Sequence, residues 1–222
     1  MRDRNAPLTA DDLGSLAWDK MDGLLPAAVQ DRGSGRLLML GYMNREALQA
    51  TLATGLATFW SRSKQRLWQK GETSGNALRV AAVHEDCDAD ALLVLADPQG
   101  PACHLGTTSC FGGEGPDGPG WLAELAAIVA DRAAAPAERS YTARLLAEGL
   151  PRIAQKVGEE GVETALAAVT RDSAGTAEEA ADLLYHLTVL MQAKDFGWAE
   201  VIEVLKARHA ASPLSPAGRG LG

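Results

Sequence analysis

Residues 112–120 interrupt the chain with the sequence GGEGPDGPG, which neither a regular helix nor a regular strand accommodates. Its five glycines give the backbone many accessible conformations, and its two prolines remove main-chain hydrogen-bond donors. The stretch lacks the lysine and serine or threonine that complete a phosphate-binding P-loop, so its glycines do not indicate a nucleotide site. We therefore predict a linker that divides the 222 residues into two domains.

The part before the linker alternates short apolar runs with turn residues, a pattern that is typical of β-strands. One helix is expected among them, with Asn44 as its N-cap and Gly55 at its end. Residues 1–23 are polar and unpatterned, and we expect a loose arm with a short helix there. The apolar runs predict strands at residues 24–30, 36–43, 57–62, 67–70, 78–84 and 91–96.

The part after the linker is rich in alanine and leucine, which favour helices. Helix breakers divide it into predicted helices at residues 121–134, 141–148, 151–170, 177–193 and 199–210. The tail, residues 211–222, is expected to be disordered. The predicted fold is thus a β-rich α+β domain at residues 24–111, followed by an all-α helical bundle at residues 121–210.

Composition narrows the classes of partner. The formal charge of −8 disfavours general binding to nucleic acid or to an anionic membrane. No apolar run is long enough to cross a bilayer, and residues 1–14 lack the apolar core of a signal peptide. Three cysteines cannot all pair within one chain, so we expect a reduced, cytoplasmic protein. From the charge and the apolar runs we expect no nucleic-acid or membrane partner.

Residues 86–110 combine two kinds of metal ligand. All three cysteines of the chain lie here, at Cys87, Cys103 and Cys110. Three acids surround the first cysteine: Asp86, Asp88 and Asp90. Thiolates suit zinc and carboxylates suit magnesium, so this segment predicts sites for two metals. The simpler alternative is three buried free thiols beside a solvated acidic turn.

A calcium-binding EF-hand also begins with alternating aspartates, but this segment departs from that motif. The sixth loop position is Ala91, where the sharp turn needs glycine, and the twelfth is Asp97 rather than glutamate. Residues 91–96 are moreover apolar in the manner of a strand, whereas an EF-hand loop leads into a helix.

Acidic residues also gather on two of the predicted helices. Glu159, Glu160 and Glu163 fall on one face of the helix at 151–170, with Lys156 among them. Glu179 and Asp182 lie three apart on the following helix, and His186 is one turn further on. Each set alone is typical of a solvated acidic face. Together, carboxylates from two neighbouring helices could hold magnesium bound to a polyphosphate.

Residues 59–76, FWSRSKQRLWQKGETSGN, place basic residues beside two tryptophans. Such a pattern binds single-stranded nucleic acid, or one nucleotide through guanidinium–phosphate and indole–base contacts. It is equally typical of a strand pair with exposed basic positions and buried tryptophans. The acidic net charge favours one phosphorylated ligand over a nucleic-acid track.

These motifs together point to a family. The segments FWSRSKQRLWQKGETSGN, DCDAD and CHLGTTSCF closely resemble phosphoribosyl-AMP cyclohydrolase, an enzyme of histidine biosynthesis. The segments QKVGEEGVETALAA and EEAADLLYHLTVLM resemble phosphoribosyl-ATP pyrophosphohydrolase, one of the all-α nucleotide pyrophosphohydrolases. The chain is therefore similar to the fused, bifunctional enzyme over about residues 24–209. The cysteine–aspartate motif is highly specific, whereas the glutamate motif is shared across the helical superfamily.

The resemblance implies roles for individual residues. It implies zinc on Cys87, Cys103 and Cys110, and magnesium on Asp86, Asp88 and Asp90. In the helical domain it implies magnesium on Glu159, Glu160, Glu163, Glu179 and Asp182. Residues expected to bind substrate are Trp60, Arg62, Lys64, Trp68, Lys70, Glu72, Ser74 and Lys156. Residues expected to act in catalysis are His104, Glu160 and Glu163.

The implied reactions run against the order of the chain. The helical domain would first hydrolyse phosphoribosyl-ATP to phosphoribosyl-AMP and pyrophosphate. The β-rich domain would then open the adenine ring of phosphoribosyl-AMP between N1 and C6, using a zinc-activated water. A zinc with three thiolates should acidify water less than one with three histidines, so we expect His104 to assist as a base.

The spacing of the cysteines alone would allow one chain to supply all three zinc ligands. The resemblance instead implies a homodimer in which Cys87 of one subunit joins Cys103 and Cys110 of the other. Two alternative functions stay open at this point. One is a general nucleotide pyrophosphohydrolase with a structural zinc domain, and the other is a zinc-stabilised nucleic-acid-binding module.

Overall fold

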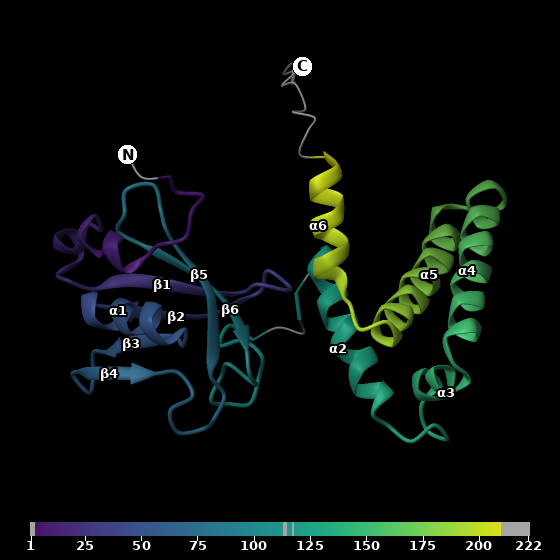
Figure 1. The fold of residues 1–222 in the computed structure, drawn as a ribbon, viewed down its shortest axis with the longest axis horizontal. Coiled ribbons are helices and arrows are strands. Elements are labelled where there is room, and N and C mark those ends of the chain that lie inside the picture. The colour runs from purple at the N-terminus through teal and green to yellow at the C-terminus, as the bar shows by residue number, and fades with distance from the viewer. Residues whose placement is uncertain (1–2, 113–114, 117, 210–222) are drawn as a thin grey trace, which may run out of the picture. The chain divides into compact units, whose positions relative to one another are not determined.

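The structure is a computed structural model that describes residues 3–112, 115–116 and 118–209. The chain divides into two compact units after Trp121 (Figure 1). The first contains the strands and the second is helical, which confirms the predicted fold class. The predicted tail, residues 211–222, lies outside the described residues, as do three residues of the predicted linker.

The first unit is built on a four-stranded sheet in the order β2-β1-β6-β5 among the residues that the structure describes. Strand β1 pairs antiparallel with β2 and parallel with β6, and β5 pairs antiparallel with β6. A separate antiparallel hairpin is formed by β3 and β4. The strands are β1 (Leu25–Asp31), β2 (Leu37–Met43), β3 (Thr58–Ser61), β4 (Arg66–Gln69), β5 (Leu78–Glu85) and β6 (Leu92–Pro98).

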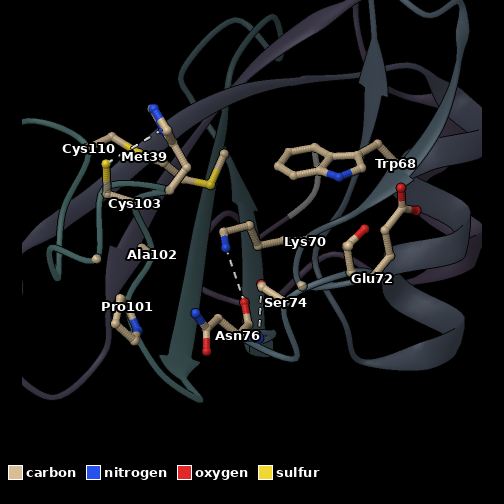
Figure 2. A pocket seen from close by; sticks show the side chains of 14 residues that line it. Met39, Trp68, Lys70, Glu72, Ser74, Asn76, Pro101, Ala102, Cys103 and Cys110 are labelled. Carbon is tan, nitrogen blue, oxygen red and sulfur yellow. Dashed lines mark hydrogen bonds between the residues drawn. The ribbon is translucent and has the colours of Figure 1, made fainter.

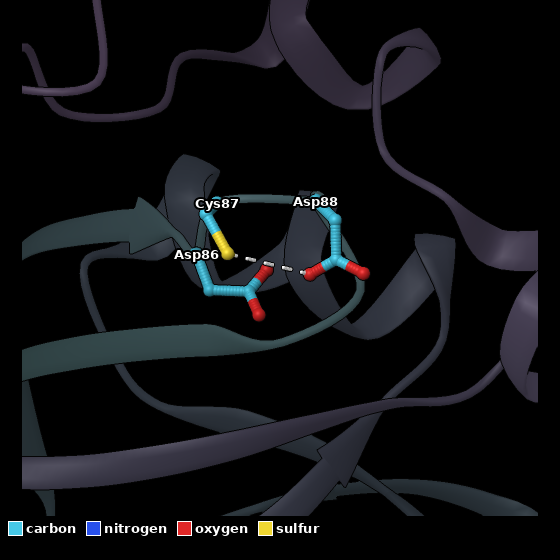
Figure 3. Close-up of side chains that lie close together, drawn as sticks. All are labelled: Asp86, Cys87 and Asp88. Carbon is cyan, nitrogen blue, oxygen red and sulfur yellow. Dashed lines mark hydrogen bonds between the residues drawn. The ribbon is translucent and has the colours of Figure 1, made fainter.

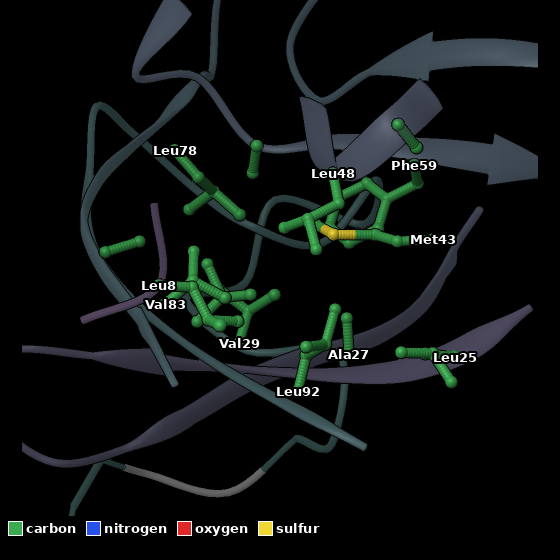
Figure 4. Packing of buried hydrophobic residues seen from close by; sticks show 14 of the residues in the cluster. Leu8, Leu25, Ala27, Val29, Met43, Leu48, Phe59, Leu78, Val83 and Leu92 are labelled. Carbon is green, nitrogen blue, oxygen red and sulfur yellow. The ribbon is translucent and has the colours of Figure 1, made fainter. Parts of the chain in front are cut away.

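The core of this unit follows from the alternation within its strands. Leu25, Ala27 and Val29 of β1 are fully buried, while the residues between them are partly exposed. Figure 4 shows these side chains packed with Leu92 of β6 and Val83 of β5. Successive side chains of a strand point to opposite faces of the sheet, so alternate residues share one face, and that face forms the core.

Helix α1 (Arg45–Thr54) lies between β2 and β3 and has the predicted ends. The Asn44 side chain accepts a hydrogen bond from the Ala47 N–H at 2.8 Å, and Gly55 ends the helix with a φ of 69°. Both devices satisfy main-chain groups that the helix itself leaves without partners. Thr51 then joins the helix to β3, because its Oγ1 accepts the Thr58 N–H at 2.9 Å.

The N-terminal segment is packed, so the prediction of a loose arm there is wrong, whereas the prediction of a short helix within it is confirmed. It forms two short 3-10 helices, Ala10–Gly14 and Trp18–Met21. The Trp18 Nε1–H donates to the Leu13 carbonyl at 2.8 Å within the core. Apolar residues on such short helices have no sustained periodicity, which is why the sequence pattern did not reveal them. The buried side chains of this segment are Leu8, Leu13, Leu16 and Trp18.

The second unit centres on two long helices that lie side by side, α4 (Leu150–Thr170) and α5 (Ser173–Ala193). Only two residues join them, so they run antiparallel (Figure 1). Helix α5 begins at Ser173 and not at residue 177 as predicted, because the Asp172 side chain caps it through the Gly175 N–H. The remaining helices are α2 (Trp121–Ala133), α3 (Tyr141–Glu148) and α6 (Trp198–His209).

None of the helices within the described residues is long and apolar enough to cross a membrane.

The packing of the N-terminal segment predicts a measurable loss of stability. Leu16 is 5% exposed, so Leu16→Ala should destabilise the first unit by about 2–5 kcal/mol. The matched control, Met21→Ala, removes a side chain that is 41% exposed and should cost about 0.5 kcal/mol or less. Hydrogen exchange of β1 and β6, followed by mass spectrometry, reports the opening free energy of this unit. Equal effects of the two substitutions would contradict the described packing.

Candidate active sites

A cavity of about 380 Å³ opens in the first unit (Figure 2). One wall is the loop that follows β4, and the opposite wall is the segment that follows β6, with Met39 of β2 between them. The lining residues include four of the predicted substrate-binding residues and three predicted for zinc or catalysis. These are Trp68, Lys70, Glu72 and Ser74, and Cys103, His104 and Cys110.

The loop after β4 is held in shape by its own backbone. Gly71 has a φ of +87°, which favours glycine, and a Cβ at this position would lie 2.5 Å from the Ala77 nitrogen. Lys70 is buried, and its Nζ donates to the Asn76 carbonyl at 3.1 Å (Figure 2). The Arg66 guanidinium holds Glu72 at 2.6 Å and lowers the pKa of that carboxyl. The loop therefore presents a fixed ammonium and an ionised carboxylate to the cavity.

The opposite wall carries two thiols with opposite tendencies. The Leu105 N–H donates to the Cys103 sulfur at 3.5 Å, and this contact is the main reason that the pKa of Cys103 lies below its ordinary value. Desolvation, followed by the negative charge of Cys103, raises the pKa of Cys110. The Cys110 N–H is fixed to the Leu38 carbonyl of β2 at 2.8 Å. The pair can thus share one negative charge, with Cys103 as its favoured position.

Cys87 does not join these thiols within the described part of the chain. It lies in the turn between β5 and β6, beside Asp86 and Asp88 (Figure 3). Because β5 and β6 are antiparallel, this turn lies at one end of β6, whereas Cys103 follows its other end. Strand β6 has seven residues, which span roughly 20 Å at about 3.3 Å each. One chain therefore brings together two of the three predicted zinc ligands.

Hydrogen bonds within the acidic turn fix its backbone, and a lysine from another part of the chain pairs with its carboxylates. Asp86 Oδ1 accepts the N–H groups of Asp90 at 3.0 Å and Ala91 at 3.2 Å, which closes the turn. The Lys20 Nζ lies 2.5 Å from Asp88 Oδ2 and 3.2 Å from Asp90 Oδ2. The Asp88 hydrogen bond is the main reason that the pKa of Lys20 is raised, and Lys20 in turn lowers the pKa of Asp88.

Sequence reasoning missed Lys20, because it lies 68 positions before Asp88 in a segment without a motif. It also missed Met39 and Asn76, which line the cavity. Glycines and small polar residues after β4 are a turn signal that could have marked Asn76. Three of the substrate-binding residues predicted in this unit do not line the cavity: Trp60, Arg62 and Lys64. Arg62 instead lies over the Tyr42 ring, 4.1 Å from its centre.

A second group of metal-capable side chains lies between α4 and α5. Glu160, Glu179 and Asp182 place their carboxylate oxygens within 4.8 Å of one another. Glu160 is buried at 5% exposure, and its oxygen lies 2.7 Å from the Lys156 Nζ. Three hard oxygen ligands from two helices fit a magnesium ion. This group omits two predicted ligands: Glu159, which contacts Lys156 at 3.0 Å, and the exposed Glu163.

Further contacts hold this carboxylate group. The Arg171 guanidinium lies 2.5 Å from Glu179, and His186 Nδ1 lies 3.6 Å from the Glu160 carboxylate. His186 is buried, with Nδ1 also 2.9 Å from the Asp182 carbonyl and Nε2 3.1 Å from the Tyr141 hydroxyl. Nδ1 can donate to the Asp182 carbonyl, and Nε2 lies within hydrogen-bond distance of the Tyr141 hydroxyl, so both contacts fix the orientation of the ring. Tyr141 and Arg171 were not predicted, because only the fold brings them here.

Comparisons with known proteins agree with this division. The family model of phosphoribosyl-AMP cyclohydrolase matches residues 39–112, and that of phosphoribosyl-ATP pyrophosphohydrolase matches residues 122–209. The chain is 54% identical over 206 residues to the histidine biosynthesis bifunctional protein HisIE of Xanthomonas axonopodis pv. citri, covering 92% of this chain and 98% of that protein. This chain belongs to the bifunctional histidine-biosynthesis family. The protein of the same name from Escherichia coli K12 is 55% identical over 204 residues, covering 91% and 99%.

Membership in the bifunctional family makes the chain a hydrolase with a cyclohydrolase part and a pyrophosphohydrolase part. Its substrates are small molecules of the histidine pathway. The cavity lies within the cyclohydrolase match, and the carboxylate group lies within the pyrophosphohydrolase match.

The loop geometry predicts different outcomes at two glycines of the bifunctional enzyme. Gly71→Ala and Gly75→Ala each place alanine at a positive φ, which costs about 1–2 kcal/mol of stability. Only the Gly71 Cβ would also meet backbone atoms of the opposite side of the loop, whereas nothing lies within 4 Å of a Cβ at Gly75. Gly71→Ala should therefore slow ring opening of phosphoribosyl-AMP at least about tenfold, and Gly75→Ala less than about threefold.

The ultraviolet change on ring opening measures both rates. Equal rates in the two variants would show that the close approach at Gly71 does not shape the cavity.

Proposed function

We propose that the cavity is the site at which the adenine ring of phosphoribosyl-AMP is opened between N1 and C6. The observation that carries this proposal is the gathering of Cys103, Cys110 and His104 opposite Trp68 and Lys70 in one cavity. The indole ring offers a surface on which a purine can stack, and the ammonium offers a charge for a phosphate. A cavity of about 380 Å³ suits a small phosphorylated ligand.

His104 is the proposed proton carrier of ring opening. Its Nδ1 lies 3.9 Å from the Cys103 sulfur, which leaves Nε2 for the substrate side of the exposed ring. During hydrolysis, Nε2 accepts a proton from the attacking water as oxygen bonds to C6, and it returns a proton to N1 as the N1–C6 bond breaks. Histidine is the side chain that most often transfers protons in general acid–base catalysis.

Cys103 and Cys110 fit a zinc ion, since thiolates are its usual protein ligands. A zinc ion held by these residues would supply a Lewis acid that makes water nucleophilic near neutral pH. We propose that the third ligand is Cys87 of a second copy, which makes the enzyme a homodimer. The position of Cys87 at the opposite end of β6 supports this proposal, because its own chain cannot deliver it to the cavity.

The carboxylate-bearing turn at residues 86–90 is the proposed magnesium site of the same domain. Asp86 and Asp88 lie beside Cys87 with their ligand atoms within 4.8 Å of one another, and Asp90 shares the Lys20 ammonium with Asp88. Carboxylate oxygens suit magnesium, which would also neutralise a phosphate of the substrate. The ligand types would direct the two metals to different sites, because carboxylates favour magnesium and thiolates favour zinc.

The carboxylate group between α4 and α5 is the proposed site of pyrophosphate release. Glu160, Glu179 and Asp182 would hold magnesium, which would supply positive charge to neutralise the triphosphate of phosphoribosyl-ATP. Lys156 lies beside them, and its ammonium can exchange its ion pair with Glu160 for one with a phosphate oxygen. Glu163 is exposed, and Glu159 is paired with Lys156. We propose that these two residues complete the ligand set or orient the attacking water.

Exposed apolar side chains support a homodimer for the helical unit as well. Val162, Leu166 and Val169 of α4 are 61%, 56% and 80% exposed in the single chain. They recur on one helix within two turns, so they form a continuous stripe. A stripe of this kind, left open to water, is typical of a surface that packs against another subunit.

The two activities should be separable by mutation. Glu160→Gln should abolish pyrophosphate release and leave ring opening of supplied phosphoribosyl-AMP intact, because the carboxylate lies in the other unit. Cys103→Ala and His104→Ala should have the reverse effect. Each variant is assayed with phosphoribosyl-ATP for pyrophosphate and with phosphoribosyl-AMP for the ultraviolet change.

A single substitution that ended both activities in a folded protein would contradict the two-site proposal. A full rate of ring opening in His104→Ala would remove His104 from its proposed role. Pyrophosphate release from many nucleotides without any ring opening would instead favour a general nucleotide pyrophosphohydrolase with a structural zinc.

The shared zinc predicts complementation between two inactive variants. Cys87→Ala and Cys103→Ala should each lack ring opening when expressed alone. In a mixed dimer, one zinc site collects both lesions and the other is intact. Random assembly makes about half of the dimers mixed, so roughly a quarter of wild-type sites should return. Absence of recovery in purified, differently tagged mixed dimers would show that each zinc is held within one chain.

A further inference from the structure

The N-terminal segment is docked directly on the acidic turn of the proposed magnesium site. The Ala17 N–H donates to the Ala89 carbonyl at 2.8 Å, at the centre of the turn. Earlier in the segment, the Leu8 N–H donates to the Val83 carbonyl of β5 at 2.7 Å. The cyclohydrolase family match begins only at residue 39, so this segment lies outside it.

Lys20 is the residue through which the segment meets the carboxylates. Its Nζ lies 2.5 Å from Asp88 Oδ2, 3.2 Å from Asp90 Oδ2 and 3.4 Å from the Asp88 carbonyl. A single ammonium thus occupies the space between two carboxylates that are only two residues apart. A divalent cation that binds these oxygens must compete with that ammonium for the same lone pairs.

We infer that Lys20 is a built-in counter-ion of the acidic turn, and that it sets the affinity of the turn for a divalent cation. In the absence of the cation, Lys20 offsets the repulsion between Asp88 and Asp90. When the cation binds, the ammonium must leave, because two positive groups repel each other at the same oxygens. This inference rests on the proposed function, because it takes the turn as a metal site.

The turn keeps its shape independently of Lys20. Asp86 Oδ1 accepts two main-chain N–H groups, from Asp90 and Ala91, and neither bond involves the lysine. The N-terminal segment is likewise held by its own buried side chains and by the Ala17–Ala89 hydrogen bond. Removal of the ammonium should therefore change the charge at the turn and leave its backbone in place.

The test is the binding of Mn²⁺ to Lys20→Met, measured by the electron paramagnetic resonance signal of the free ion. Mn²⁺ prefers oxygen ligands, so it reports on carboxylates and not on the thiols. Glu179→Gln and Asp182→Asn are included in every protein to remove the site of the helical unit. Lys20→Met should bind Mn²⁺ about 3- to 10-fold more tightly, the size expected for removing two partly exposed ion pairs.

The matched control is Arg32→Gln, which removes one positive charge from a partly exposed ion pair with Asp97 in the same unit. It should leave Mn²⁺ affinity within about twofold, because Asp97 lies near the end of β6 that is opposite to the turn, and solvent screens charges over such a separation. Unchanged or weaker binding in Lys20→Met, while Asp88→Asn abolishes binding, would overturn the inference and keep the metal site. Absence of binding that depends on Asp88 would overturn both the inference and the proposed site.

A measurement on the unmutated chain adds a second test. Acetylation of lysines by a limiting reagent, followed by mass spectrometry, should increase at Lys20 when Mg²⁺ is added, because the displaced ammonium becomes free. Lys206 is the internal control, since its ion pair with Glu203 at 2.8 Å lies in the other unit and outside the carboxylate group. Equal labelling of Lys20 with and without Mg²⁺ would overturn the displacement.

Discussion

Acidic side chains that lie within a few ångströms of one another repel, and this constraint applies to both acidic groups of the chain. Neighbouring carboxylates repel, which raises the free energy of a folded chain that gathers them. In each group a basic side chain lies against the acids: Lys20 at the aspartate turn, and Lys156 and Arg171 between the long helices. The basic side chains offset this repulsion, so the carboxylate oxygens of each group can lie close together in the folded chain.

The two units meet this constraint with different architecture. Between α4 and α5, regular helical spacing places Lys156 one turn before Glu160, so one helix carries both the acid and its cation. At the aspartate turn no regular element is present, and the frame consists of main-chain N–H groups bonded to Asp86. The cation there must come from another part of the chain. This requirement gives the N-terminal segment a reason to be packed against the turn.

The same difference explains how far the sequence alone could be interpreted. Features that depend on neighbours in the chain were predicted correctly, such as the Asn44 cap, the Gly55 end of α1 and the helical unit. Contacts over long separations had no local signal: Lys20 with Asp88, and Tyr141 with His186 across 45 positions. The burial of Leu16 likewise has no local signal, because it depends on packing against residues of the sheet that are distant in the sequence. The cap at Asp172 was a local signal that the glycine at 175 obscured.

The position of Cys87 would link the two metal sites that we propose for the cyclohydrolase part. Cys87 lies between Asp86 and Asp88 in one turn, so a partner that receives its thiol also receives the flanking carboxylates. Under the shared-zinc proposal, each cavity is therefore completed by the whole aspartate turn of the other subunit. Lys20, held on that turn, would then act at the cavity of the partner and not at that of its own chain. Dimer formation and metal loading would consequently be coupled, because one short turn carries ligands for both.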